Sequence, residues 1–97
     1  MSKRRSGTIT CAEVAQHTSR DDLWIILKDR ETNEYKVYDI TDEVEDHPGG
    51  DAILEPAGRD ATEKFYGPQH PGRVFDMIED YFVAPLSDPE NIIKKKD

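Results

Sequence analysis

The clearest pattern of hydrophobic and polar positions lies between residues 23 and 39. Leu23–Lys28 is a compact and mostly apolar run, residues 29–34 are polar, and Tyr35–Asp39 returns to aromatic and β-branched side chains. Two short runs of this kind, joined by a polar turn, predict a β-hairpin. The loop is long for a hairpin, so we expect a surface extension that the fold tolerates; contact between this loop and a partner is the alternative.

Toward the C-terminus, apolar residues recur at helical intervals, at positions 74, 75, 78, 81 and 82, and predict a helix from about Arg73 to Phe82. Thr10 and Glu13 have the spacing of a capping box, and Asp60 is expected to cap another short helix. The short helical segments expected here cover residues 11–17, 42–46, 51–54 and 61–66. The chain is therefore expected to be an α+β domain with a small, mixed, twisted sheet and two helix pairs that open like jaws.

Composition limits the chain to one small domain. Only 35% of the 97 residues are hydrophobic and the mean hydropathy is -0.82, so the core is modest. We expect a basic, disordered start at residues 1–7, a folded domain at 8–86 and a polar tail at 87–97. The longest apolar run, Leu23–Leu27, is far shorter than the roughly 20 residues of a spanning helix, so we expect a soluble protein without a membrane anchor.

The chain is acidic, with a formal net charge of -8 at pH 7. Many of its carboxylates cluster in the middle of the sequence, at Asp42, Glu43, Glu45, Asp46, Asp51, Glu55, Asp60 and Glu63. One interpretation is a solvated face that keeps the protein in solution. The other, compatible with the first, is an acidic rim that steers basic partners. The same field repels phosphate, so nucleic acid is a poor candidate partner.

Cys11 is the only cysteine, which excludes an intrachain disulfide and indicates a reducing compartment. Three histidines without clustered Cys/His pairs fit zinc poorly. Cys11 has no nearby nucleophilic partner in sequence, and the acidic residues do not pair into a convincing acid/base site. The sequence therefore does not predict an enzyme.

Two histidines lie in turns built from proline and glycine. One opens the tetrapeptide His47-Pro48-Gly49-Gly50, and the other follows in Gly67-Pro68-Gln69-His70-Pro71. Proline fixes φ, and glycine allows backbone angles closed to other residues, so each turn is suited to aim an imidazole. With a short helical stretch between them, the two turns predict one metal gripped from two sides. His17 is expected instead at a helix end or on the surface.

The histidines belong to a longer series of motifs, which runs Trp24-Ile25-Ile26, Lys36-Val37-Tyr38-Asp39-Ile40-Thr41, HPGG, Ala57-Gly58-Arg59-Asp60-Ala61-Thr62-Glu63-Lys64-Phe65 and His70. In that order, from about Ile9 to Leu86, the chain resembles a cytochrome b5-type haem domain. The resemblance implies a cytochrome b5-like fold with a haem pocket between its helix pairs. It also implies a non-covalent haem b (protohaem IX) cofactor, in agreement with the absence of a C-x-x-C-H attachment motif.

The same resemblance implies His47 and His70 as the axial ligands of the haem iron. With both bound, no coordination position stays open, which suits the transfer of single electrons. The ring nitrogen that does not bind iron is expected to donate to a backbone carbonyl. The side chains implied as the pocket wall are Ile40, Val44, Pro48, Ile53, Leu54, Phe65, Pro68, Met77 and Tyr81.

Much of this wall would be core in any case, because a domain this small builds both from the same atoms. Trp24 is expected in a second core, behind the sheet. Burial of a haem contributes on the order of 10 kcal/mol gross at ~25 cal/mol per Å². We therefore predict that the haem-free protein is much less stable.

Three positions depart from the family pattern. Glu43 stands where the family usually has a large aromatic, so either its carboxylate turns to solvent or the local helix shifts. The segment between HPGG and Ala57-Gly58 is one residue short and contains Pro56, which trims the jaw helix. Pro71 replaces a hydroxyl residue that often holds a haem propionate; Arg73 is the candidate substitute, and a solvated helix-start arginine is the alternative.

The predicted function is that of a b-type haem electron carrier, which is not itself an enzyme. Its expected partners are a flavin-dependent reductase resembling NADH-cytochrome b5 reductase and a haem or non-haem iron acceptor, met through the acidic surface. We expect a cytoplasmic monomer. The alternatives are the haem domain of a larger oxidoreductase, a haem- or steroid-binding regulator of the kind that uses tyrosine, and an adaptor without metal. The paired histidines weigh against the regulator, whereas Glu43 keeps the adaptor open.

Overall fold

The computed structural model describes residues 3–47, 50–66 and 77–92. Within them, four strands form an antiparallel sheet of order β1-β2-β3-β4, with bounds Thr18–Ser19 (β1), Asp22–Lys28 (β2), Tyr35–Asp39 (β3) and Phe82–Pro85 (β4). The helical elements are short: α1 (Cys11–Val14), α2 (Thr62–Phe65) and the 3₁₀ turns η1 (Thr41–Glu43), η2 (Gly50–Leu54), η3 (Ile78–Tyr81) and η4 (Pro89–Asn91). The predicted α+β class is confirmed. Among the described residues, parallel pairing occurs in two isolated bridges, Ile9 with Leu86 and Ile26 with Asp60.

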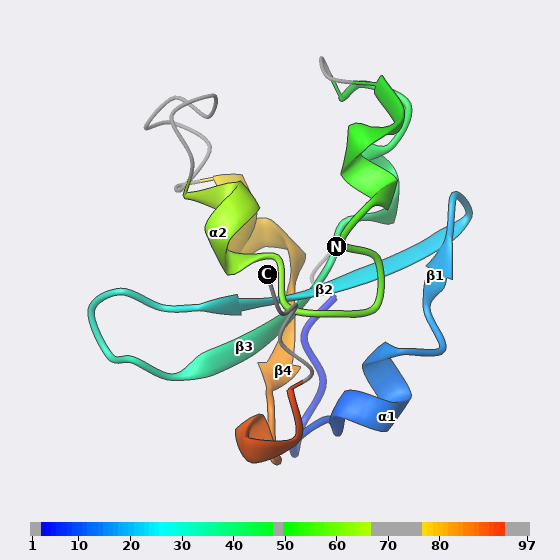
Figure 1. Ribbon diagram of the computed structural model, residues 1–97. Coiled ribbons are helices and arrows are strands. Elements are labelled where there is room, and N and C mark those ends of the chain that lie inside the picture. The colour runs from blue at the N-terminus through cyan, green and yellow to red at the C-terminus, as the bar shows by residue number, and fades with distance from the viewer. Residues whose placement is uncertain (1–2, 48–49, 67–76, 93–97) are drawn as a thin grey trace.

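Two arms rise from one side of the sheet (Figure 1). We call residues 41–54, which contain η1 and η2, the first arm. The second arm consists of residues 62–66 and 77–81, which contain α2 and η3. Toward the opposite side of the sheet lie α1 and η4. The arms thus stand in the place that the sequence predicted for two helix pairs.

The predicted hairpin is confirmed. Strand β2 pairs with β3 from Trp24 opposite Asp39 to Lys28 opposite Tyr35. Asp29 organises the loop, because its Oδ1 accepts from the backbone N–H of Glu31 at 2.8 Å and its N–H donates to the carbonyl of Glu34 at 2.8 Å. An aspartate that bonds its own backbone two residues on is a common loop closure, and it gives this extension a defined shape.

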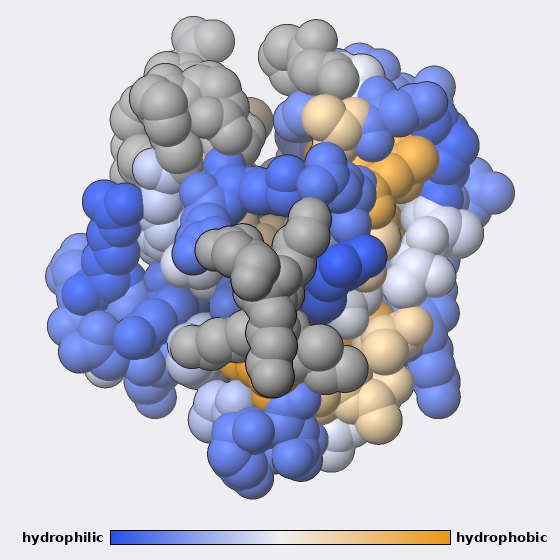
Figure 2. Space-filling model, viewed as in Figure 1, coloured by the Kyte–Doolittle hydropathy of each residue, from blue (hydrophilic) through white to orange (hydrophobic). Residues whose placement is uncertain are grey.

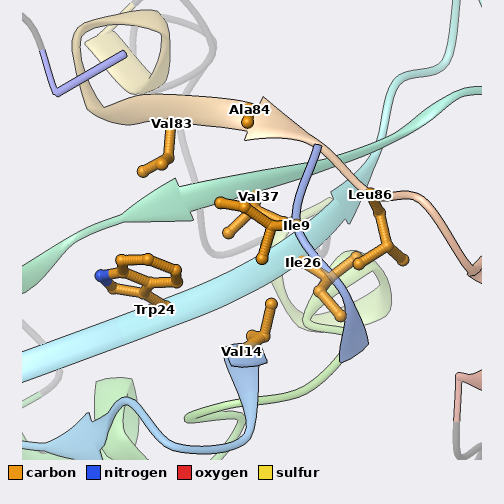
Figure 3. Packing of buried hydrophobic residues seen from close by; sticks show 8 residues of the cluster. All are labelled: Ile9, Val14, Trp24, Ile26, Val37, Val83, Ala84 and Leu86. Carbon is orange, nitrogen blue, oxygen red and sulfur yellow. The ribbon is translucent and has the colours of Figure 1, made fainter. Parts of the chain in front are cut away.

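Alternation along β2 divides the interior into two cores, because successive side chains of a strand point to opposite faces. The core between the sheet and the arms contains Leu23, Ile25, Leu27, Tyr38, Ile40, Val44, Ala61 and Phe65. The core behind the sheet contains Ile9, Val14, Trp24, Ile26, Val37, Val83, Ala84 and Leu86 (Figure 3). The predicted place of Trp24 behind the sheet is confirmed.

Residues 58–61 run along the edge of β2 that the two-residue strand β1 leaves open. Gly58 N–H donates to the carbonyl of Trp24 at 2.7 Å, Ile26 N–H donates to Arg59 at 3.0 Å, and Ala61 N–H donates to Ile26 at 2.8 Å. Covering an exposed strand edge prevents pairing with another chain. Here the covering segment is also the link between the two arms, so it fixes the base of both to the sheet.

Helix ends differ from the predicted ones. Thr10 caps α1 as predicted, accepting from Glu13 N–H at 3.1 Å, but the helix ends at Val14 rather than near residue 17. The helix ends early because the chain turns to pack the His17 ring against Trp24. The backbone N–H of Trp24 donates to the His17 carbonyl at 3.0 Å.

At the C-terminal side, the predicted helix of residues 73–82 falls outside the described residues up to position 76. Residues 77–81 are helical, but Phe82 begins strand β4 and pairs with Tyr38. Assigning Phe82 to the helix was wrong, because pairing with β3 outweighs a helical spacing carried by aromatic side chains that also suit a strand.

The described ends of the chain pack on the sheet. Arg5 N–H donates to the Val83 carbonyl at 2.8 Å, and Ser87 N–H donates to Ile9 at 2.9 Å. Asp88 accepts from Cys11 N–H at 2.8 Å and so caps α1 from the far end of the chain. The domain bounds stay a prediction. Among the described residues, no helix has both the length and the apolar character that crossing a membrane requires.

Candidate functional site

The first arm is anchored where β3 ends. Leu23 N–H donates to Thr41 Oγ1 at 2.9 Å, and Ile40 N–H donates to the Leu23 carbonyl at 2.9 Å. Asp39 Oδ1 accepts from both the N–H and the hydroxyl of Thr41, at 3.0 and 2.6 Å. The turn η1 that follows brings Ile40 and Val44 into the core beneath the arms, where they are 5% and 4% exposed.

His47 lies between η1 and η2 and is half-buried. Its Nδ1 is 3.2 Å from the carbonyl oxygen of Gly50, and the Gly50 N–H donates back to the His47 carbonyl at 2.9 Å. Gly50 has a φ of +62°, in the left-handed region that favours glycine. A carbonyl only accepts, so Nδ1 donates in this contact, and in the neutral imidazole the unprotonated nitrogen is then Nε2. This is the type of backbone contact expected from the sequence.

The second arm begins at Asp60, whose Oδ1 accepts from the Thr62 N–H at 2.9 Å and from the Thr62 hydroxyl. Lys28 N–H donates to Thr62 Oγ1 at 2.9 Å, which ties this arm to the end of β2. Asp60 thus accepts from the first N–H of the helix, but the predicted cap position was wrong by one residue, because α2 starts at Thr62 and its N-cap is Ala61. Phe65 then points into the core beneath the arms and is 8% exposed.

The implied pocket residues are placed unequally. Ile40, Val44 and Phe65 are buried in the core beneath the arms, and Ile53, Leu54 and Tyr81 pack at its margin half-buried. Met77 is 45% exposed. Four implied residues, Pro48, Pro68, His70 and Arg73, lie outside the described residues, as does Pro71, so their roles stay predictions.

Glu43 takes neither of the two courses expected for it. Its Oε1 accepts a hydrogen bond of 2.5 Å from the hydroxyl of Tyr81, which links η1 to η3 across the base of the arms. This hydrogen bond to the carboxylate, together with burial, raises the pKa of Tyr81 to about 12. A second link joins Lys64 Nζ to Glu55 Oε1 at 2.9 Å, at the exposed side of the arms. A carboxylate thus replaces the family's aromatic side chain by bonding to the opposite arm.

Ion pairs with basic side chains neutralise part of the acidic surface. Arg20, in the turn between β1 and β2, pairs with Asp51 at 2.6 Å and with Glu45 at 3.3 Å. Lys3 Nζ lies 3.2 Å from Asp42. Asp46 is exposed and has no hydrogen bond or ion pair with any residue in the described ranges. In the view of Figure 2, hydrophilic residues cover much of the described surface.

His17 has a structural role. Its ring stacks on Trp24 with centroids 3.6 Å apart and an interplanar angle of 6°, and its Nδ1 is 2.7 Å from Asp22 Oδ2. Nothing in this arrangement offers a metal site. Within residues 3–47, 50–66 and 77–92, no group of three or more His, Cys, Asp or Glu side chains is arranged to hold a metal ion.

The site chemistry fits an iron porphyrin. The arms enclose apolar side chains suited to a macrocycle, and His47 offers an imidazole of defined tautomer. Sequence reasoning missed two features of the site, the Tyr81–Glu43 hydrogen bond and the Arg20 ion pairs. The first joins residues 38 positions apart and the second spans 25 and 31 positions, so no local pattern marks either.

Comparison with known proteins agrees with this geometry. The family model described as "Cytochrome b5-like Heme/Steroid binding domain" matches residues 10–87. The "Cytochrome B5-like protein" of Arabidopsis thaliana is 60% identical over 82 residues, which are 84% of this chain and 63% of that protein. The "NADH-cytochrome b5 reductase-like protein alnC" of Emericella nidulans is 42% identical over 89 residues, which are 88% of this chain and 18% of that protein.

Among solved structures, the "Cytochrome b5 of Ostreococcus tauri virus 2" superimposes with a TM-score of 0.69 at 33% identity and covers 89% of this chain and 93% of that one. The chain therefore spans nearly all of a solved relative, but less than two thirds of the Arabidopsis protein.

Proposed function

The chain belongs to the cytochrome b5-like haem/steroid-binding family, and from that premise we propose that it carries single electrons on a haem whose iron is held between His47 and His70. Domains of this family bind a b-type haem. When bound, the haem supplies a one-electron iron couple. On this proposal the protein is a carrier and does not itself transform a substrate.

The observation that carries the proposal is the hydrogen-bonded state of His47. Because the Gly50 carbonyl fixes the proton on Nδ1, Nε2 is the nitrogen able to bind iron without first losing a proton. Ile40, Val44 and Phe65 are buried beneath the arms and would give the haem an apolar wall. A second imidazole from His70 would leave no position for oxygen, which restricts the centre to electron transfer.

The state of Tyr81 argues against the class of relatives that uses a tyrosine ligand. A phenol binds iron as tyrosinate, but the hydrogen bond to Glu43 holds this hydroxyl as a donor and raises the pKa of Tyr81 to about 12. A metal-free adaptor is also disfavoured, since the arms keep an apolar wall and a histidine in a defined tautomer.

We propose a flavin-dependent reductase as the electron donor and a haem or non-haem iron protein as the acceptor. Support comes from the similarity to a protein named as NADH-cytochrome b5 reductase-like, of which this chain matches 18%. The same similarity leaves open that the chain is a haem domain of a larger oxidoreductase. A monomeric, cytoplasmic carrier remains our proposal for the free chain.

Absorption spectroscopy tests the ligand assignment. The purified protein, oxidised and then reduced with dithionite, should show the bands of low-spin haem b. His47→Ala and His70→Ala should each abolish them. His17→Ala is the matched control, because that histidine stacks on Trp24 behind the sheet and should leave the spectrum intact. A preparation that stays colourless after hemin is added, or an unaltered spectrum in His47→Ala, would sink the proposal.

The acidic surface has a separate test. Asp46→Asn should slow reduction by a basic partner at low ionic strength and have little effect at high salt, because screening shortens the reach of exposed charges. The control is Glu90→Gln, which removes the same charge from η4, at the end of the molecule away from the arms (Figure 1). Equal rates for the two variants at every salt concentration would remove the steering role.

A further inference from the structure

One arginine spans the turn that presents His47. Arg20 lies between β1 and β2, its Nη1 is 2.6 Å from Asp51 Oδ1, and its Nη2 is 3.3 Å from Glu45 Oε2. Glu45 stands two residues before His47, and Asp51 follows Gly50 directly. The guanidinium therefore grips the chain on both sides of the ligand turn, and the β1–β2 turn lies beside the first arm in Figure 1.

The first arm is anchored at its base by Thr41, by buried Val44 and by the Glu43–Tyr81 hydrogen bond, all on the η1 side of His47. Neither η1 nor η2 contains a buried residue, and both are short 3₁₀ turns. Short 3₁₀ segments have weaker hydrogen-bond geometry than α-helices. Contacts from outside the arm must then supply much of its rigidity, and a planar guanidinium that bonds two carboxylates fixes their separation better than a single ammonium would.

The contacts lead from Arg20 to the imidazole in two steps. Arg20 holds Asp51, and the peptide bond joins Asp51 to Gly50, whose carbonyl accepts from His47 Nδ1 at 3.2 Å. At the other end of the turn, Arg20 also bonds Glu45. A change in the spacing between these carboxylates would move the Gly50 carbonyl and rotate the ring that it orients.

We propose that Arg20 is a positioning residue, which sets the ring orientation of His47 and slows loss of the haem by bracing both ends of the ligand turn. The inference rests on the proposed function, because it takes His47 as a ligand of the haem iron. Arg20 does not itself touch the reacting centre.

The test compares Arg20→Gln and Arg20→Lys with a control, Arg59→Gln, in the haem-loaded full chain. Arg59 is an exposed arginine whose guanidinium has no hydrogen bond or ion pair with any residue in the described ranges, so its variant removes the same charge without the brace. Arg20→Lys keeps the charge but loses the planar fork.

Three measurements apply: transfer of haem to excess apomyoglobin, the low-spin electron paramagnetic resonance signal, and hydrogen exchange at the Gly50 amide. We expect haem loss to quicken on the order of threefold in Arg20→Gln, since exposed ion pairs contribute modestly even in a network. The resonance signal should shift and Gly50 exchange should quicken. Arg20→Lys should recover only part of these effects, and Arg59→Gln should change none.

Matching values for Arg20→Gln and Arg59→Gln in all three measurements would overturn the brace. Full recovery in Arg20→Lys would also overturn it, because charge alone would then suffice. These outcomes differ from failure of the ligand assignment. If His47 does not bind the haem iron, His47→Ala keeps its low-spin spectrum. If only the brace fails, His47→Ala still loses that spectrum.

Discussion

Gly58 is the most crowded glycine in the described chain, and it yields the sharpest stability prediction. Its φ of +73° lies in the left-handed region, and its N–H donates to the Trp24 carbonyl at 2.7 Å. A methyl group at this position would lie 2.6 Å from Thr18 Cγ2 and 3.2 Å from Ala15 Cα. Gly58→Ala should therefore strain the segment that joins the arms along the edge of β2.

Three terms set the size of the effect. A left-handed conformation costs a non-glycine residue about 1–2 kcal/mol. Overpacking against Thr18 and Ala15 adds about 1–3 kcal/mol. The stiffer unfolded chain of the alanine variant offsets about 0.4–1 kcal/mol of this loss. We predict a net loss of about 2–4 kcal/mol in the free energy of unfolding, a large share of the stability of a small domain.

Urea unfolding followed by circular dichroism, at fixed protein and haem concentrations, measures this loss. Gly7→Ala separates strain from crowding, because Gly7 has a φ of +83° but nothing within 4 Å of the added methyl, so its cost should be about 1 kcal/mol. Thr18→Ser removes the colliding Cγ2 and should restore about 1 kcal/mol to Gly58→Ala. Equal losses in the two alanine variants, or no coupling with Thr18→Ser, would refute the reasoning.

Three further predictions follow from the same contacts. The pKa of Tyr81 is about 12 in the folded state, against 10.0 unperturbed. The stability that its protonated phenol contributes is therefore complete below pH 10 and is lost as the pH rises toward 12. Glu43→Gln should lower the pKa of Tyr81 in an ultraviolet titration. Burial and the neighbouring Asp88 carboxylate raise the pKa of Cys11 to about 11. Alkylation of Cys11 near neutral pH should therefore be about a hundredfold slower in the folded chain than in the urea-unfolded chain, and Asp88→Asn should speed it. Equal rates in the folded and unfolded chains would contradict this prediction. Removing haem should lower the unfolding midpoint yet leave the wavelength of maximum Trp24 emission close to that of the folded chain. An emission maximum at the unfolded position would show that the core behind the sheet needs the cofactor.

Local patterns in the sequence predicted the parts of the fold that depend on neighbouring residues. The hairpin of β2 and β3 follows from two apolar runs around a polar loop, whereas the expected place of Trp24 behind the sheet came with the family resemblance. The cap of Thr10 on α1 depends on a spacing of three residues. In the hairpin and in the cap, the partner is near in sequence.

The parts that the sequence did not predict depend on pairing between distant segments. Strand β4 is short, and Phe82 fits a helical spacing until its pairing with Tyr38 is known. The Tyr81–Glu43 hydrogen bond decides the fate of a carboxylate that looked misplaced in an apolar pocket. For the second predicted ligand, His70, the assignment still depends on the family resemblance and on the proposed spectroscopy.

The division of the interior by the sheet has a consequence for how the protein matures. Every member of the core behind the sheet comes from residues 9–37 or 83–86, so none belongs to either arm. The chain is therefore expected to pack this core before it binds haem. We therefore expect the chain without haem to be partly folded, with this core intact and the core beneath the arms less ordered.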